Sequence, residues 1–213
     1  MHQDQPDHAQ HYYACLTAMD EQIGRLRVEL ESLGIADNTM ICFCSDNGPA
    51  RQGSPRHVGT AKNLKGYKLS LNEGGIRVPG LMIWPKKIKE PRTVNAPCFT
   101  SDYFPTILAA LDISLPDDRT YDGVNILPFA TGQKTERKKP LGFLNKDGKE
   151  AAWIENRFKL ISRPKGDELY DLIADPGEKT DLIKDKPEIA KRMAAELSTW
   201  KAEVMAELKA VPK

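Results

Sequence analysis

The chain has 213 residues, of which 31 are Lys or Arg, 30 are Asp or Glu and 40% are hydrophobic. This predicts a soluble globular protein with one large domain, or one domain and a small second one. The formal net charge of +1 offers no field that attracts nucleic acid or an anionic membrane, so we expect neither partner. No apolar stretch approaches the roughly 18 residues of a membrane span, and residues 1–8 lack the features of a signal peptide. The chain as given is expected to be neither exported nor anchored.

The first predicted elements are a long helix and a buried strand. Apolar residues recur at three- and four-residue steps between about residues 8 and 33, as in an amphipathic helix, and Gly34 is expected to end it. The stripe consists of Leu16, Met19, Ile23, Leu26, Leu30 and Leu33. Residues 39–44 are continuously apolar, as in a strand buried on both faces of a parallel sheet. A helix followed by a buried strand predicts an α/β domain. A central strand of a parallel sheet needs parallel neighbours, but no predicted strand precedes this helix in the sequence.

The four cysteines carry no metal or disulfide signature. Cys15, Cys42, Cys44 and Cys98 form no C-x-x-C pair and no repeated spacing. Cys42 and Cys44 face the same side of the predicted strand, where we expect small buried side chains rather than ligands.

A long loop, a second strand and a short helix complete the first domain, which we assign to residues 1–132. Residues 51–71 are rich in Gly, Lys and Ser, and loops of that length are usually functional or disordered. A strand is expected at residues 80–85 and a helix at 101–111. The run 134–140 is expected to be a solvated linker, because Glu136 interrupts its basic residues.

The second domain is assigned to residues 141–213. Short strands at 141–144, 151–155, 158–161 and 168–172 are separated by turn sequences typical of an antiparallel meander. A helix begins at about Pro187, and we expect its apolar stripe to cover the small sheet. The stripe is Ile189, Met193, Leu197, Trp200, Val204 and Leu208.

The sequence at residues 45–49, Ser-Asp-Asn-Gly-Pro, follows the first predicted strand directly. Ligand sites of parallel sheets gather at that edge, and the carboxylate of Asp46 and the amide oxygen of Asn47 suit a hard cation such as calcium or magnesium. The same residues also make an ordinary turn. The pattern alone leaves both interpretations open.

A series of short motifs runs through nearly the whole chain in fixed order. They are Tyr13-Ala14 through Asp20 and Gly24, residues 45–48, residues 68–79, Asp102 with Pro105-Thr106, Asp122-Gly123, and residues 168–172. The most specific is the string 68–79, KLSLNEGGIRVP, which follows SDNG at 45–48. Together the motifs resemble the type I sulfatase family of the alkaline phosphatase superfamily. The resemblance implies an α/β fold with part of a mainly parallel sheet flanked by helices, plus a small C-terminal antiparallel sheet packed on a helix.

The resemblance also implies roles for particular residues. Asp46 and Asn47 would be calcium ligands, and Lys68 would contact the sulfate of a sulfated carbohydrate or aryl sulfate. A cation and an ammonium lower the barrier when a sulfate ester gathers negative charge as its S–O bond breaks. His57, in the loop between them, is a weaker candidate for substrate contact, since an exposed loop histidine is more often a bystander.

The residues around the string 68–79 suggest a supporting role for its glycines. Gly74 and Gly75 would permit positive φ and close backbone approach, and Glu73 would pair with Arg77.

The nucleophile of the family is missing from this sequence. Sulfatases carry a cysteine in C-x-P-S-R or C-x-A-S-R that is oxidised to formylglycine, and none of the four cysteines lies in such a motif. The resemblance therefore implies the C-terminal portion of a sulfatase, inactive alone, whose full-length relatives are expected in the periplasm or outside the cell. Two alternatives are a phosphate or phosphonate ester hydrolase of the same superfamily and a non-catalytic cation- or glycan-binding protein. Substrate and regioselectivity are not encoded in these motifs.

Overall fold

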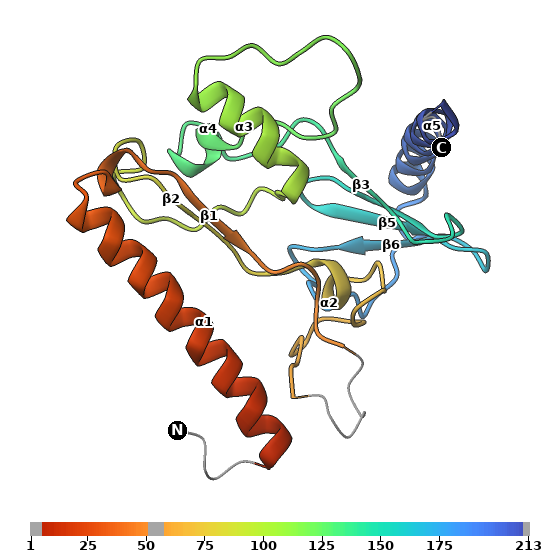
Figure 1. Ribbon diagram of the computed structural model, residues 1–213. Helices are drawn as coiled ribbons and strands as arrows, with labels where there is room; N and C mark the ends of the chain where they lie inside the picture. Colours follow the sequence, from red (N-terminus) through yellow and green to blue (C-terminus); the bar gives the residue numbers. More distant parts are fainter. Residues whose placement is uncertain (1–5, 51–57, 211–213) are drawn as a thin grey trace.

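The computed structural model describes residues 6–50 and 58–210, which form an α/β arrangement (Figure 1). The fold class predicted from the sequence is confirmed, with two sheets and five α-helices in the described residues. The helices are α1 (Asp7–Ser32), α2 (Glu73–Ile76), α3 (Tyr103–Ala110), α4 (Leu127–Ala130) and α5 (Pro187–Ala210). The strands are β1 (Ile41–Cys44), β2 (Gly80–Ile83), β3 (Leu141–Leu144), β4 (Ala151–Ile154), β5 (Phe158–Ser162) and β6 (Glu168–Asp171).

The first sheet has two strands, β1 and β2, which pair antiparallel with Ile41 opposite Ile83 and Cys44 opposite Gly80. The parallel neighbours expected for β1 are not among the described residues, and β1 is half-buried instead of buried on both faces. On β2 the side chain of Leu81 is 63% exposed. A strand with a single partner keeps one edge free and lacks the packing that would bury both its faces.

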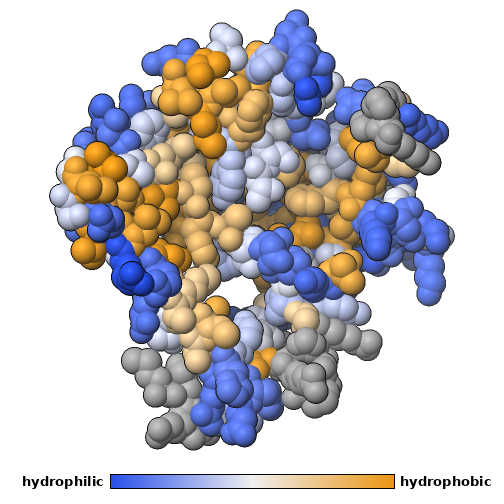
Figure 2. All heavy atoms as spheres, viewed as in Figure 1, coloured by the Kyte–Doolittle hydropathy of each residue, from blue (hydrophilic) through white to orange (hydrophobic). Residues whose placement is uncertain are grey.

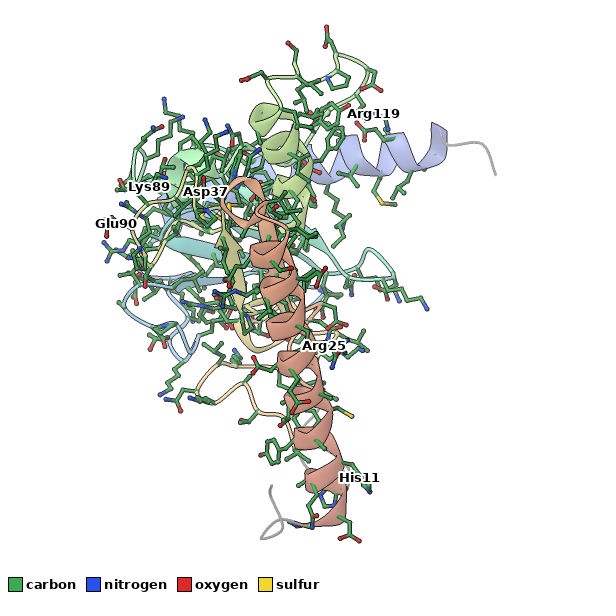
Figure 3. The ribbon with its side chains drawn as sticks, turned by 60° about the vertical axis from the view of Figure 1, so that its left-hand side comes forward. His11, Arg25, Asp37, Lys89, Glu90 and Arg119 are labelled. Atoms are coloured by element: carbon green, nitrogen blue, oxygen red, sulfur yellow. The ribbon has the colours of Figure 1, made fainter. Side chains whose placement is uncertain are left out.

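Helix α1 forms where the apolar periodicity predicts it and is followed by Gly34 at a φ of +68°. Its apolar stripe is not covered, because only Ala9 is buried on this helix while Leu26 is 50% and Leu33 60% exposed. Figure 3 shows α1 along the outside of the molecule, with Arg25 and His11 on the stretch that runs away from the sheets. No helix in the described ranges combines the length and apolarity needed to cross a bilayer.

Exposed apolar side chains extend from α1 onto neighbouring elements. They include Leu81 and Ile83 on β2 and Phe104 and Ile107 on α3. Figure 2 shows apolar side chains gathered on the side where Figure 1 places α1, the β1–β2 sheet and α3. We call this surface the α1–β2–α3 face; its apolar side chains are grouped, whereas exposed apolar residues that are scattered singly are usual on a monomer.

The second sheet is antiparallel with strand order β3-β4-β5-β6, as the predicted meander requires. One face packs against α5, whose Met193 and Leu197 are buried, so the predicted cover of this sheet is confirmed. The opposite face packs against residues 71–76, where Leu71 and Ile76 meet side chains of the sheet. The alternation of side chains along each strand thus places α5 on one side and the segment before β2 on the other.

The prediction that residues 134–140 form a solvated linker is wrong at Arg137. Its side chain is buried and makes a two-pronged ion pair with the buried Asp102, with Nη1 2.8 Å from Oδ2 and Nη2 2.9 Å from Oδ1. Asp102 also accepts hydrogen bonds from the amides of Phe99 and Val124. A buried carboxylate needs such donors, and Arg137 supplies the compensating charge.

Candidate functional site

Asp46 and Asn47 follow β1 directly, at the end of the strand where the sequence places a cation site or a turn. Asp46 is exposed, with the Ser45 hydroxyl 3.5 Å from its Oδ1, and the Asn47 amide donates to the carbonyl of Gly48 at 3.0 Å. Nowhere in residues 6–50 and 58–210 do three or more His, Cys, Asp or Glu side chains gather as a metal cluster. The carboxylate and amide oxygens are suitable donors for a hard cation, but they are two donors where calcium takes 6 to 8.

Two backbone hydrogen bonds join this segment to the one that carries Lys68. The amide of Gly48 donates to the carbonyl of Gly75 at 2.8 Å, and the amide of Lys68 donates to the carbonyl of Pro49 at 2.8 Å. The structure therefore brings together residues that lie some twenty positions apart in the sequence. We call this pairing of residues 46–49 with residues 65–76 the two-segment site.

The glycines of the two-segment site are required by close backbone contact. A Cβ on Gly48 would stand 1.9 Å from the carbonyl oxygen of Gly74, and one on Gly75 would stand 2.1 Å from that of Ser70. The predicted close approach is confirmed. The predicted positive φ is not found at Gly74 or Gly75, since both lie in the helical turn α2; in this region it occurs at Gly66 and Leu69.

Lys68 is exposed, and within the described parts of the chain its ammonium has no ion-pair partner. It precedes Leu69, which adopts a φ of +77° and is 86% exposed. The neighbouring Lys65 instead donates to the hydroxyl of Tyr170 at 2.8 Å. Lys65 therefore has a hydrogen-bond partner on the sheet. Lys68 has no ion-pair partner in the described residues, so its ammonium is available for an anionic ligand. His57 lies outside the described residues.

Behind Lys68, a buried ion network that the sequence analysis missed supports the site. The ammonium of Lys159 lies 2.8 Å from Glu73 Oε1 and 2.9 Å from Glu178 Oε1, and the amide of Glu73 donates to Glu178 Oε2 at 2.8 Å. Lys159 and Glu178 are 0% exposed and Glu73 is 4% exposed. Arg77 lies 3.6 Å from Glu73, as predicted. The one sequence signal was a lysine inside the otherwise apolar strand at 158–161.

The thiols of Cys42 and Cys98 are not activated. Desolvation, followed by the nearby Cys44, raises the pKa of Cys42. Desolvation and then the negative charge of Asp102 raise the pKa of Cys98 to about 11. Thiols with a raised pKa stay protonated at neutral pH and are poor nucleophiles. The half-buried position of Cys42 agrees with a packing role, whereas Cys98 is exposed.

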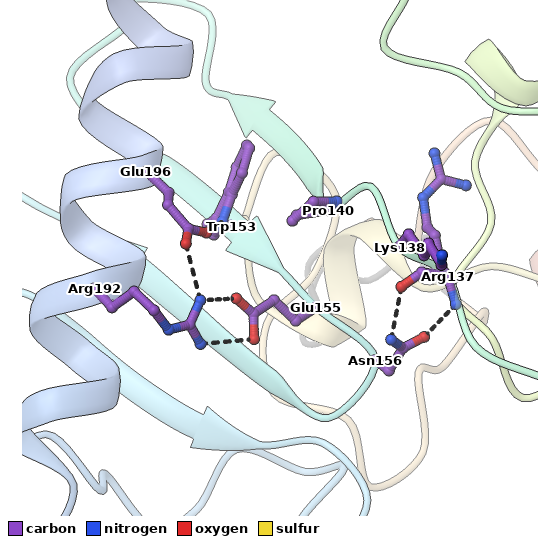
Figure 4. Close-up of a pocket in the computed structure, with 8 residues that line it drawn as sticks. All are labelled: Arg137, Lys138, Pro140, Trp153, Glu155, Asn156, Arg192 and Glu196. Carbon is purple, nitrogen blue, oxygen red and sulfur yellow. Dashed lines mark hydrogen bonds and ion pairs between the residues drawn. The ribbon is translucent and has the colours of Figure 1, made fainter.

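A groove of about 500 Å³ lies elsewhere, between α5, β4 and residues 137–140 (Figure 4). Three of its charged groups pair with one another, with Arg192 2.5 Å from Glu155 and 3.0 Å from Glu196, and the indole of Trp153 donates to Glu196 at 3.0 Å. Neither Asp46 nor Lys68 lines it. The groove is therefore separate from the two-segment site and contains no unpaired charge among these residues.

Comparisons with known proteins point to one family over almost the whole chain. The model of the family described as Sulfatase matches residues 2–113, and that of N-sulphoglucosamine sulphohydrolase, C-terminal, matches residues 67–203. Steryl-sulfatase of Rattus norvegicus is 33% identical over 148 residues, which are 67% of this chain and 26% of that protein. N-acetylgalactosamine-6-O-sulfatase of Bacteroides thetaiotaomicron is 30% identical over 206 residues, 86% of this chain and 40% of that protein.

The fold gives the same result. The solved structure of Ps i-CgsB in complex with k-i-k-neocarrahexaose matches with a TM-score of 0.82 and 28% identity, over 92% of this chain and 44% of that one. The chain thus spans less than half the length of these relatives. Because a family model covers more than half of its residues, the chain belongs to the sulfatase family.

Proposed function

We propose that this chain provides part of the active site of a sulfuric ester hydrolase, with Lys68 as the sulfate contact and Asp46 and Asn47 as cation ligands. The observation that carries the proposal is the pair of backbone hydrogen bonds, Gly48 to Gly75 and Lys68 to Pro49. They hold the segment with the hard-cation donors against the segment with the unpaired ammonium. Positive charge on both sides would stabilise the negative charge that grows on the oxygens of a sulfate ester in its transition state.

The chemistry of the donor set fits a calcium ion. Asp46 would supply a carboxylate oxygen and Asn47 an amide oxygen, the kinds of ligand that calcium prefers. When bound, the ion would supply positive charge opposite the sulfate oxygens. Two donors fall short of the usual coordination number, so the remaining ligands are assigned to polypeptide outside this pair.

Lys68 would act on the ester oxygens. As the S–O bond breaks, negative charge grows on the bridging oxygen that leaves, and an ammonium within hydrogen-bond distance stabilises it. The exposure of Lys68, together with the hydrogen bond of its own backbone amide to Pro49, supports this role. The ammonium can reach outward while the backbone stays fixed.

The nucleophile is assigned to polypeptide outside these 213 residues, because neither C-x-P-S-R nor C-x-A-S-R occurs in the sequence. The chain alone would then bind but not turn over a sulfate ester. The exposed α1–β2–α3 face supports an active site shared between this chain and further polypeptide. It has the apolar surface on which further elements of the fold would pack.

We propose a sulfated carbohydrate as the substrate class. The support is that the relative with 86% coverage of this chain is an N-acetylgalactosamine-6-O-sulfatase and that the Ps i-CgsB structure holds an oligosaccharide. The match to steryl-sulfatase keeps an aryl or steryl sulfate as the competing class.

Sulfate binding by the isolated chain tests the assignment of Lys68. Sodium sulfate would be titrated into ¹⁵N-labelled protein against sodium chloride at equal ionic strength. We expect millimolar binding, with amide shifts at Gly48, Lys68 and Gly75 that disappear in Lys68→Ala. Lys62→Ala, which removes an exposed lysine of the same loop, is the control and should bind as the unaltered chain does. An equal loss of sulfate binding in both variants, or unchanged binding in Lys68→Ala, would contradict the assignment.

A further inference from the structure

Three contacts tie the segment that carries Lys68 to the four-stranded sheet. At one end Lys65 donates to Tyr170 on β6 at 2.8 Å, and further along Arg163, just after β5, donates to Asn72 Oδ1 at 2.7 Å. The third contact is the buried network in which Lys159 of β5 meets Glu73. These contacts come from residues about 90 to 105 positions away in the sequence, so they join the two halves of the chain.

The buried network is unusual in its composition. One ammonium faces two carboxylates, and the side chains of all three residues are at most 6% exposed. Glu178 is held at a φ of +53°, a conformation that non-glycine residues rarely adopt. Burying charge and strained backbone together costs free energy, and a fully apolar contact would serve packing alone as well or better. This cost is consistent with a requirement for a fixed geometry at Glu73.

Glu73 is well placed to transmit that geometry. It begins α2, and the next two residues fix the backbone of the site. The carbonyl of Gly75 accepts from the amide of Gly48 in the other segment, and the amide of Gly74 donates to the carbonyl of Lys65 within the same segment at 2.7 Å. A displacement of Glu73 would therefore move the backbone on both sides of Lys68. None of these contacts touches the Lys68 side chain itself.

We infer that Lys159 is a positioning residue for the two-segment site, acting through Glu73 with Glu178 as its second partner. The four-stranded sheet thereby serves as the platform that fixes the backbone around Lys68. The inference rests on the proposed function, from which it takes the contact of Lys68 with sulfate. It goes beyond that function in assigning a role at the site to the C-terminal sheet.

The first test is native-state hydrogen exchange of the full chain in Lys159→Met, which keeps the volume and removes the charge. The amides of Gly48, Gly74 and Gly75 should exchange at least about tenfold faster, relative to the amides of α5, than in the unaltered chain. The control is Arg137→Lys, which weakens the other buried ion pair, that with Asp102. Its loss of stability should leave the ratio between site and α5 amides unchanged.

The second test separates positioning from general stability. Sulfate affinity is measured by the titration above. It should fall by about fivefold or more in Lys159→Met and change by less than about twofold in Arg137→Lys. If Lys159→Met does not fold, Tyr170→Phe tests the role of the sheet as a platform, since it removes the hydroxyl that accepts from Lys65 and donates to Glu168. That variant should show the same local pattern, with exchange at Gly74 about threefold faster.

The outcomes are distinguishable. Faster exchange confined to the site amides supports the inference, and unchanged exchange in both Lys159→Met and Tyr170→Phe overturns it. Faster exchange spread equally over α5 also overturns it, because the network would then be a general stability element. Absence of sulfate binding by the unaltered chain would contradict the proposed function of Lys68, while the exchange comparison would still decide whether Lys159 fixes the segment.

Discussion

Gly48 is the residue at which the two segments of the site touch through backbone alone. The nearest atom to a Cβ built there would be the carbonyl oxygen of Gly74 at 1.9 Å, which belongs to buried backbone and cannot rotate away. A side chain of any size would therefore separate Asp46 and Asn47 from Lys68. The site depends on glycine for space, and this requirement is independent of any positive φ.

The change Gly48→Ala should lower the free energy of unfolding by about 2 kcal/mol or more, because overpacking against backbone cannot be relieved by a rotamer change. Urea denaturation gives the value. Gly80→Ala is the matched control: it adds the same methyl on β2, where nothing lies within 4 Å of the added Cβ, and it should change stability by at most about 0.5 kcal/mol. Equal effects of the two changes would contradict the contact.

Asp171 shows how a single carboxylate contributes to stability. It is 5% exposed and accepts from Arg157 Nε at 2.8 Å and from the amides of Ile173 and Ala174. The hydrogen bond with Arg157 lowers the pKa of Asp171, partly opposed by desolvation. A depressed folded-state pKa means that this stabilisation is complete above the pKa of an unfolded aspartate, about 4, and is lost as the pH falls through the lower folded value.

Accordingly, Asp171→Asn should lower the thermal midpoint at pH 7, and the difference from the unaltered chain should shrink steadily below about pH 4. Thermal unfolding followed by circular dichroism between pH 2.5 and 7 measures it. A difference that stays constant down to pH 2.5 would show that the carboxylate charge does not matter.

Among the elements, the segment at 134–140 is held by the buried side chain of Arg137 and by Asn156, which bonds to both the amide and the carbonyl of Arg137. Arg137 neutralises Asp102, next to α3, while its Nε donates to the carbonyl of Lys139 at 2.5 Å. The side chains of both ion-pair partners are at most 1% exposed. Because each group is desolvated, removing one leaves the other buried without its partner.

We expect Arg137→Met to cost about 3–5 kcal/mol of unfolding free energy. Arg119→Met removes an arginine that is 66% exposed and paired with Asp118, and this change should cost about 1 kcal/mol or less. Chemical denaturation of both variants checks the contrast. Similar costs for the two would mean that the Asp102 pair has little more effect than a surface contact.

The elements with a clear period were predictable from sequence. The stripe of α5 follows from apolar spacing, and β3 to β6 follow from short strand-like runs separated by turn sequences. These elements were confirmed within a residue or so at most ends. The turn α2 was not predicted, because two glycines in four residues oppose a helix. It forms where Glu73, Gly74 and Gly75 are buried, between residues 46–49 and the four-stranded sheet. Burial of Lys159 and Arg137 was also missed, since their partners lie far away in the sequence and no local pattern signals them.

For the candidate site, sequence motifs named the residues and the structure supplied the contact between them. Asp46 and Asn47 could be suggested from their place after a strand, but Lys68 had no local feature that separates it from Lys62 or Lys65. Only the family resemblance singled it out. The assignment of the first domain to residues 1–132 and the second to residues 141–213 stays a prediction.

At the scale of the whole molecule, the proposed cation site would be incomplete within the described residues. Two oxygen donors at Asp46 and Asn47 are too few for tight calcium binding. Calorimetry with calcium chloride on the isolated chain should therefore show no binding in the micromolar range. Micromolar binding that is lost in Asp46→Ala would contradict this, and would mean that the chain supplies further ligands by itself.

The central claim, that Lys68 belongs to a sulfatase active site, is tested most directly by sulfate ester hydrolysis in a chimera. This chain would replace the matched 40% of the Bacteroides thetaiotaomicron N-acetylgalactosamine-6-O-sulfatase, and folding would be checked by thermal unfolding. The chimera should hydrolyse 6-sulfated N-acetylgalactosamine, whereas the chain alone should not. Lys68→Ala should lower kcat by about 100-fold or more, with Lys62→Ala nearly unchanged. A folded chimera whose kcat is the same with and without Lys68 would contradict the account.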